Sequence, residues 1–230
     1  MVHFTLFGIP VYIRPSFWVV LAIFGGALSI SSVEDIIYPA LFVIAGFVAI
    51  LSHEMGHALV GRKLGGGQQT IVLELFGGLT SSHGMQLTRG GRALMILAGP
   101  MMTLLLGIIS LWLTWNIVAP VMTSYNLNFW DLAISPFTAA LISPKLYILS
   151  CLIMIGEWWT ILNLLPIYPL DGGQLIAQYI RSPRKVFMTG FITAILIGLL
   201  SFQLFHGYFI PIFMTLFAYS NYREYKNAPF

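Results

Sequence analysis

Two histidines and a glutamate form the group in this chain whose spacing is most suited to chemistry. The segment Leu51-Ser52-His53-Glu54-Met55-Gly56-His57 places the two imidazoles four residues apart within an apolar stretch. Residues four apart lie on one face of an α-helix, separated by about 6 Å along its axis. Two such imidazoles can bind one zinc ion, with the intervening carboxylate as general base. The pattern predicts a metal-dependent hydrolase, and the alternative is a polar helix face that neighbouring helices satisfy.

The composition predicts a membrane protein with several spans. The 230 residues are 58% hydrophobic and only 8% charged, whereas soluble proteins are about 25% charged. Because ionisable groups inside a bilayer are costly and usually functional, the motif predicts chemistry within the membrane. The one cysteine, Cys151, excludes an intrachain disulfide, and no run of basic residues indicates nucleic-acid binding. The first apolar run, after Arg14, lacks a clear cleavage site, so we expect it to be retained as a span.

Six segments are apolar enough to predict transmembrane helices. Their expected ranges are Ser16–Ile30, Tyr38–Val60, Ala93–Ala119, Leu146–Leu165, Val186–Phe205 and Tyr208–Ser220. Six crossings place all but one of the 11 basic residues on the side of the N-terminal segment, and only Lys145 on the other. This asymmetry predicts that the basic side is cytoplasmic and that both ends of the chain lie there. Five crossings would move Arg223 and Lys226 outside and fit less well.

Two stretches have the composition of strands rather than of helices. The first covers residues 3–14 and contains the turn signal Gly8-Ile9-Pro10. The second, Gln69–Thr80, is too short to span as a helix and is interrupted by Gly77-Gly78. A β-hairpin that dips into the bilayer fits this stretch, provided that protein covers its backbone groups. We therefore expect an α-helical polytopic membrane protein with about six transmembrane helices and a small membrane-associated or re-entrant β element.

Catalytic zinc usually takes three protein ligands, and two acidic residues compete for the third position. Asp171 follows two prolines and precedes Gly172-Gly173, which by itself is typical of a turn. Counted back from the nearest basic residue, however, Asp171 and the two histidines have similar depths on the same side, so the topology lets them meet. Glu157, in the fourth predicted span, is the rival carboxylate, or a neighbour of the ligands. The remaining histidines fit less well, since they lie in terminal or polar segments or at the opposite face: His3, His83 and His206.

Together these motifs resemble the site-2 protease family of intramembrane zinc metalloproteases. His53–His57 is similar to the His-Glu-x-x-His helix of that family, and Asn163–Gly173 to its more specific Asn-x-x-Pro…Asp-Gly-Gly signature. Phe76–Leu79 and Ala98–Pro100 resemble its re-entrant hairpin and the start of its third span. The resemblance covers most of residues 5–175, with neither a PDZ domain nor a CBS pair. It implies a minimal, prokaryotic type of member with one domain, residues 1–230, and a catalytic core at about 38–175.

The resemblance also implies an enzyme with one Zn²⁺ ion. The implied metal ligands are His53, His57 and Asp171, the general base is Glu54, and the substrate-binding residues are Asn163, Gly77 and Gly78. Such an enzyme uses zinc-activated water to cleave peptide bonds in or near the transmembrane segments of membrane-bound signalling precursors. A single-span substrate protein and the lipid bilayer are the expected partners, and a prokaryotic cell membrane the expected location. Two alternatives stay open: a metal-ion transporter or channel, and a catalytically inactive adaptor that binds membrane segments.

Overall fold

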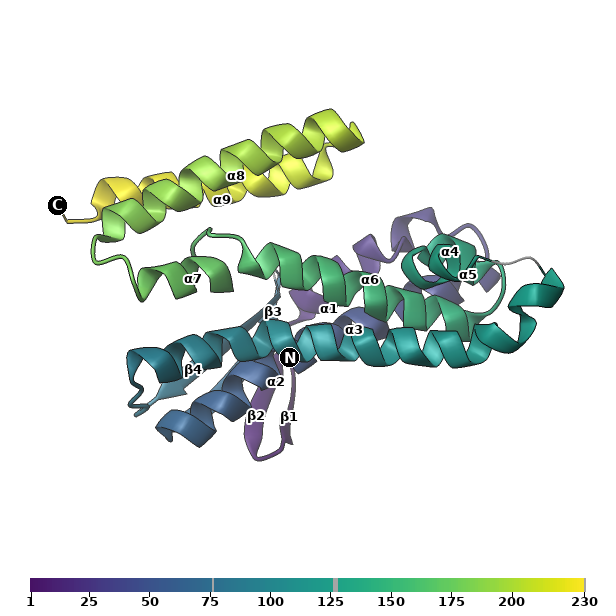
Figure 1. The fold of residues 1–230 in the computed structure, drawn as a ribbon, viewed down its shortest axis with the longest axis horizontal. Helices are drawn as coiled ribbons and strands as arrows, with labels where there is room; N and C mark the ends of the chain where they lie inside the picture. Colours follow the sequence, from purple (N-terminus) through teal and green to yellow (C-terminus); the bar gives the residue numbers. More distant parts are fainter. Residues whose placement is uncertain (76, 126–127, 230) are drawn as a thin grey trace. The chain divides into compact units, whose positions relative to one another are not determined.

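The structure, a computed structural model, describes residues 1–75, 77–125 and 128–229 (Figure 1). Phe76, part of the expected hairpin, lies outside the described residues. The chain forms two compact units, Met1–Thr160 and Ile161–Phe230, with the boundary inside α6. Its elements are β1 (Val2–Leu6), β2 (Ile9–Ile13), α1 (Pro15–Phe24), η1 (Ala27–Ser29), η2 (Glu34–Ile36), α2 (Ile37–Gly65), β3 (Gln68–Glu74), β4 (Gly77–His83), α3 (Arg89–Tyr125), α4 (Phe129–Ile134), α5 (Pro136–Ala140), α6 (Pro144–Leu164), α7 (Asp171–Ala177), α8 (Pro183–Phe205) and α9 (Phe209–Asn227).

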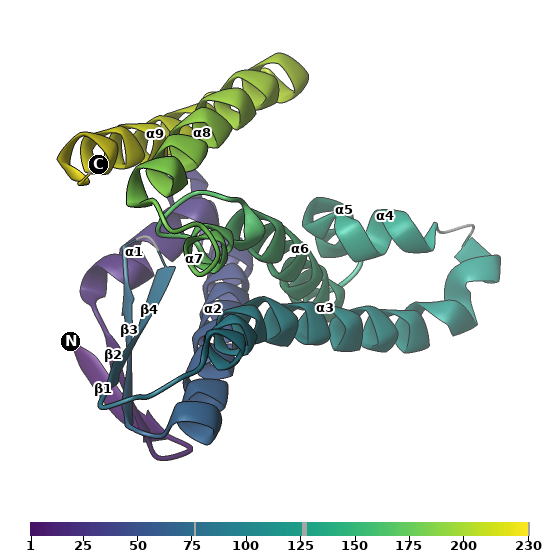
Figure 2. The ribbon, with the colours of Figure 1, turned by 60° about the vertical axis from the view of Figure 1, so that its left-hand side comes forward.

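A sheet with the strand order β1-β2-β3-β4 belongs to the first unit (Figure 2). The β1–β2 and β3–β4 pairs are antiparallel, and β2 pairs with β3 in parallel. The first hairpin turns at Phe7 and Gly8, whose φ angles are 50° and 75°, as two-residue turns that match the strand twist require. The turn therefore overlaps the expected Gly8-Ile9-Pro10 signal at Gly8, and Pro10 lies within β2, opposite Thr5.

One face of this sheet packs on α1 and α2 and forms the main core of the first unit. Alternate residues of β2 and β3 are buried, as in strands with one covered face. The core consists of sheet residues Ile9, Val11, Ile13, Ile71 and Leu73 and helix residues Phe17, Leu21, Ile50, Met55 and Ala58. Burial of this apolar surface fixes β3, and with it the β3–β4 hairpin, against the helix that carries the His-Glu-x-x-His motif.

Small residues let α2 and α3 approach each other closely (Figure 1). A Cβ on Gly56 would overlap the backbone carbonyl of Ala98, and a Cβ on Gly61 would lie 3.0 Å from Sδ of Met95. Such contacts are typical of helix pairs in membranes, where close backbone approach provides much of the packing energy. The approach brings the first turns of α3, including Gly99, beside the motif on α2.

The second unit is built around the antiparallel pair α8 and α9, and its buried core is Ile167, Ala194, Met214 and Ala218. Asn221 of α9 is buried and donates from Nδ2 to the carbonyl oxygens of Tyr168 (2.6 Å) and Phe217 (2.9 Å). Gly190 of α8 makes room for it, since a Cβ there would overlap Oδ1 of Asn221. Because Tyr168 lies shortly before Asp171, this contact holds the loop that leads into α7.

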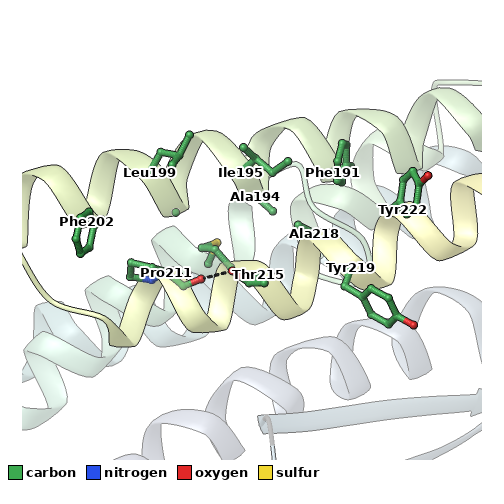
Figure 3. Close-up of a pocket in the computed structure, with 12 residues that line it drawn as sticks. Phe191, Ala194, Ile195, Leu199, Phe202, Pro211, Thr215, Ala218, Tyr219 and Tyr222 are labelled. Atoms are coloured by element: carbon green, nitrogen blue, oxygen red, sulfur yellow. Dashed lines mark hydrogen bonds between the residues drawn. The ribbon is translucent and has the colours of Figure 1, made fainter.

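An apolar groove of about 600 Å³ lies along α8 and α9 (Figure 3). Its walls include Phe191, Ile195, Leu199 and Phe202 from α8 and Tyr219 from α9. Apolar side chains that face outward in this way suit a surface that lies against hydrocarbon.

Four described helices are long and apolar enough to cross a membrane: α2, α3, α6 and α8. Each covers one of the predicted spans, except that α6 ends at Leu164, one residue before the predicted end of the fourth. The first predicted span overlaps α1, which has only 10 residues and thus reaches about 15 Å. The last predicted span falls in α9, which is not among the four. The helical fold with a small sheet agrees with the prediction, and the count of six crossings stays a prediction.

Candidate metal centre

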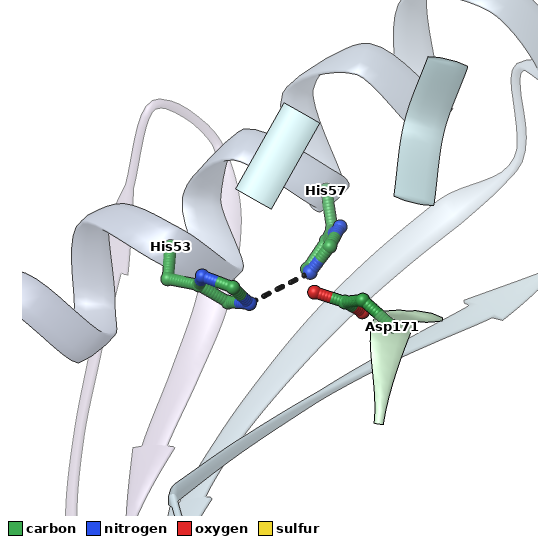
Figure 4. A group of neighbouring side chains, drawn as sticks. All are labelled: His53, His57 and Asp171. Atoms are coloured by element: carbon green, nitrogen blue, oxygen red, sulfur yellow. Dashed lines mark hydrogen bonds between the residues drawn. The ribbon is translucent and has the colours of Figure 1, made fainter. Parts of the chain in front are cut away.

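His53 and His57 are brought together by one turn of α2. Both are buried, and both side chains leave the helix on the same side (Figure 4). Their Nε2 atoms lie 3.1 Å apart, close to the separation of about 3.3 Å for two imidazoles on one tetrahedral zinc ion. Nδ1 of His57 lies 2.8 Å from the carbonyl oxygen of Met95. Because a carbonyl can only accept, this Nδ1 carries the proton, and Nε2 is the ring nitrogen with a lone pair, as a metal ligand requires.

Gly99 of α3 lets the backbone of that helix pack closely against the two imidazoles. A Cβ at this position would overlap Nε2 of His57 and lie 2.9 Å from Nε2 of His53. Any larger residue at this position would therefore crowd the two nitrogens. Two imidazole nitrogens placed side by side fit a borderline-soft ion such as Zn²⁺.

A buried carboxylate is the candidate for the third donor. Among the described residues, one group of three side chains could hold a metal ion, and it consists of His53, His57 and Asp171. Each offers one ligand atom, and these atoms all lie within 4.8 Å of one another (Figure 4). Asp171 is the first residue of α7 and is buried. Two imidazoles and one carboxylate are a frequent ligand set of catalytic zinc.

The rival ligands lie elsewhere. Glu157 is exposed on α6 and is not a member of this group. The other three histidines, His3, His83 and His206, are also exposed. Asn163, expected to hold substrate, is buried in the last turn of α6.

Glu54 is buried where α2 meets β4. The hydroxyl of Thr80 donates to Oε2 of Glu54 at 2.7 Å, and its oxygen also lies 3.2 Å from the backbone carbonyl oxygen of Glu54. Gly78 lies two residues earlier on the same face of the strand. A Cβ on Gly78 would overlap the Glu54 side chain and lie 2.6 Å from Oε1. The strand β4 therefore contacts the carboxylate directly.

Gly77 is required by the backbone and by an aromatic neighbour. Its φ angle of 124° is one that side-chain-bearing residues rarely adopt. A Cβ there would also lie 2.7 Å from Cζ2 of Trp159, whose ring stands edge-to-face to His53 at a centroid distance of 6.5 Å. Gly77 thus lets the start of β4 reach the aromatic wall beside the histidines.

Two residues near the motif were not singled out from the sequence. Thr80 could have been found, since strand alternation puts positions 78 and 80 on one face of the same strand. Trp159 carries no comparable signal, because it is one of 6 tryptophans in an apolar chain. Its place beside His53 follows from the packing of α6, which is a long-range property.

Comparison with known proteins identifies the family of the chain. The model of peptidase family M50 matches residues 41–205, well over half of the chain. The chain belongs to peptidase family M50. This M50 member is 30% identical over 227 residues to Zinc metalloprotease MJ0392 of Methanocaldococcus jannaschii, an alignment that covers 94% of this chain and 57% of that relative. A relative from Synechocystis is 28% identical over 188 residues, covering 76% of this chain and 43% of its own length.

The chain thus spans about half the length of these two relatives. The fold of this M50 member also resembles a solved structure, "Site-2 Protease from Methanocaldococcus jannaschii", with a TM-score of 0.61 and 24% identity. That match covers 97% of this chain and 94% of the other. The family expected from the motifs and the helical fold class are both confirmed.

Proposed function

We propose that this protein is an intramembrane zinc metalloprotease that cleaves peptide bonds in or near the transmembrane segments of single-span membrane proteins. The observation that carries the proposal is the arrangement on α2. Two imidazole Nε2 atoms lie 3.1 Å apart on one side of the helix, and the carboxylate between them in sequence is held by β4. Membership of a peptidase family supports the reaction class, and the name of the Methanocaldococcus relative supports zinc as the metal.

The chain's own groups have distinct tasks in this mechanism. His53, His57 and Asp171 would hold one Zn²⁺ ion, which when bound polarises a peptide carbonyl and activates water. Glu54 accepts a proton at its carboxylate during attack and returns it to the amine that leaves. The side-chain amide of Asn163 is proposed to hold the substrate backbone. Metal transport alone would not require a general base at position 54.

The outer edge of β4 is the place we propose for an extended substrate segment. β3 is paired on both edges, with β2 and with β4, so neither edge is available for pairing with a substrate. A proline at Val72 or Leu73 would therefore break the scaffold rather than a substrate contact. Among the described strands β4 pairs only with β3, and it contacts Glu54. Because a helical substrate hides its carbonyls in hydrogen bonds, main-chain pairing with β4 would stabilise the unwound form.

The proposed setting is a prokaryotic cell membrane. The relatives come from an archaeon and a bacterium. His57 precedes Arg62 by five positions on α2, or about 8 Å, so the proposed site lies a short distance inside the cytoplasmic face. Water reaches the site from that side in this arrangement.

Zinc content and cleavage, measured on the same purified preparations, test the proposal. The probes are peptides with one span of about 20 apolar residues, a Gly-Pro interruption, and a fluorophore and quencher at their ends, in detergent micelles. Glu54→Gln removes the base and keeps the ligands, so zinc stays at the wild-type level while cleavage falls to background. Asp171→Ala removes a ligand, so zinc and cleavage fall together.

Each contrary result has a definite meaning. Substantial cleavage by purified Glu54→Gln would remove Glu54 from its role, and full zinc content in Asp171→Ala would point to another third ligand. Zinc-dependent ion flux in liposomes without cleavage of any probe would favour the transporter. Peptide binding without cleavage by zinc-loaded wild type would favour the adaptor.

A further inference from the structure

We propose that Thr80 is a positioning residue that holds Oε2 of Glu54, so that Oε1 is the oxygen that accepts and returns the proton. This assignment depends on the role proposed above for Glu54 as the general base. It adds to the reaction a residue from outside both sequence motifs, on an element that follows the motif helix in the chain.

The hydrogen bond itself is the first observation. The hydroxyl of Thr80 donates to Oε2 of Glu54 at 2.7 Å, and hydroxyl-to-carboxylate bonds are roughly twice as strong as neutral ones. The same oxygen lies 3.2 Å from the backbone carbonyl of Glu54. One hydroxyl proton serves one acceptor at a time, and the shorter contact with the charged group is the stronger. Glu54 is buried, so little water competes for this oxygen.

Gly78 provides the second observation, from the other side of the carboxylate. An added Cβ there would lie 2.6 Å from Oε1 and overlap the side chain of Glu54. The backbone of β4 thus limits how the carboxylate can turn, while Thr80 holds one oxygen. A glutamate has several rotatable bonds and loses considerable rotamer entropy when fixed. Fixing it in advance matters, because a displacement of 1 Å at a reacting group can cost about 10²-fold in rate.

The strand that orients the base is also the strand whose edge is proposed for the substrate. Thr80 and Gly78 project toward Glu54, whereas the backbone of the same residues lies in the edge strand. A substrate segment paired with β4 would therefore have its register set relative to the carboxylate by one rigid element. The alternation of Gly78 and Thr80 on one face is what makes both contacts possible.

Four variants separate a positioning role of Thr80 from a purely structural contact between β4 and α2. Thr80→Val removes the donor at nearly constant shape, and Thr80→Ser restores a hydroxyl. Ser82→Ala is the matched control, because Ser82 lies on the same strand and its hydroxyl bonds Gln69 instead of Glu54. Thr80→Ala serves as a second donor-free variant in case valine does not fit.

We expect kcat of Thr80→Val to fall on the order of 10- to 100-fold for a peptide probe that wild type cleaves. KM, zinc content and the thermal midpoint in detergent should change little. Thr80→Ser should recover kcat to within about threefold of wild type, and Ser82→Ala should leave kcat unchanged. Wild-type kcat in both Thr80→Val and Thr80→Ala would overturn the proposal. Loss of zinc or of the folded state in both variants would also overturn it, since Thr80 would then be required for the structure and would not act by positioning Glu54.

An infrared measurement gives a readout that does not depend on activity. The difference spectrum between wild type and Glu54→Gln isolates the carboxylate bands of Glu54. In the Thr80→Val background these bands should shift, because Oε2 has lost its hydrogen bond, and in Thr80→Ser they should return. Unshifted bands would overturn the positioning role even if Glu54 is the base. Cleavage by Glu54→Gln itself would instead sink the proposed function, so the two failures are distinguishable.

Discussion

Gly99, Gly78 and Met95 shape the site although none of them has a group that could serve as a strong metal ligand. Gly99 lets the backbone of α3 approach both imidazoles, and Gly78 leaves room for the carboxylate of Glu54. The carbonyl of Met95 accepts from Nδ1 of His57 and so selects the tautomer whose Nε2 can bind a metal. At the scale of single residues, the chemistry depends on close backbone approach as much as on the titratable side chains.

Gly99→Ala tests this dependence. The added methyl would overlap Nε2 of His57 and lie 2.9 Å from Nε2 of His53. We therefore expect zinc affinity to fall on the order of 10- to 100-fold. The helix should remain intact, since alanine has a higher helix propensity than glycine. Gly107→Ala on the same helix is the control, because a Cβ there meets no atom within 4 Å. Metal analysis after dialysis against a zinc buffer gives the affinity. Equal zinc binding by the two variants would show that the metal does not lie beside Gly99.

At the scale of elements, the sheet has two outer edges, and they differ in what they adjoin. β1 forms one edge and β4 the other. Only β4 contacts Glu54 through its side chains, and the core holds β3 in place behind it. An exposed strand edge is a template for pairing with another chain. The edge of β4 therefore offers both the hydrogen-bonding groups and the proximity to the base that a protease needs.

Disulfide crosslinking compares the two edges directly. In a Glu54→Gln protein that also carries Cys151→Ala, we introduce Leu79→Cys on β4 or Val2→Cys on β1. The native side chains are 55% and 54% exposed, so the two positions are equally accessible. A peptide probe with one cysteine beside its Gly-Pro interruption should crosslink severalfold more at position 79. Equal yields at the two edges would show that β4 does not receive the substrate.

What the sequence could and could not predict follows from how local each feature is. The pairing of His53 with His57 depends only on helical periodicity, and the four long helices depend only on runs of apolar residues. The Gly8 signal predicts the first hairpin turn, but the residue type of Phe7 does not predict the positive φ that this residue adopts there. The parallel pairing of β2 with β3 and the contact of Thr80 with Glu54 join segments far apart in the chain. Spacing alone carries no information about such contacts.

At the scale of the whole molecule, two contacts bear on how the chain crosses the membrane. Arg62 near the end of α2 donates from Nη1 to the carbonyl oxygen of Phe7 at 2.8 Å, so the first hairpin lies at that end of α2. Residues 15–36 connect this hairpin to the opposite end of α2 and must therefore run back along it. In the second unit, Nε of Arg184 donates to the carbonyl oxygen of Ala228 at 2.9 Å. The end of α9 thus returns to the start of α8.

The paths of residues 15–36 and of α9 support six crossings. The first crossing would then be made by α1 and the turns after it rather than by one long helix. Labelling of single cysteines with a membrane-impermeant maleimide, in intact cells and a Cys151→Ala background, tests this topology. Leu28→Cys and Tyr208→Cys should react from outside, whereas Phe7→Cys and Asn227→Cys should react only after permeabilisation. The first three native side chains are 82%, 70% and 68% exposed, so failure to react would reflect the membrane rather than the protein. With six crossings the basic residues near both chain ends stay in the cytoplasm. If Phe7→Cys and Leu28→Cys react from the same side, residues 15–36 do not cross, and the charge asymmetry needs another explanation.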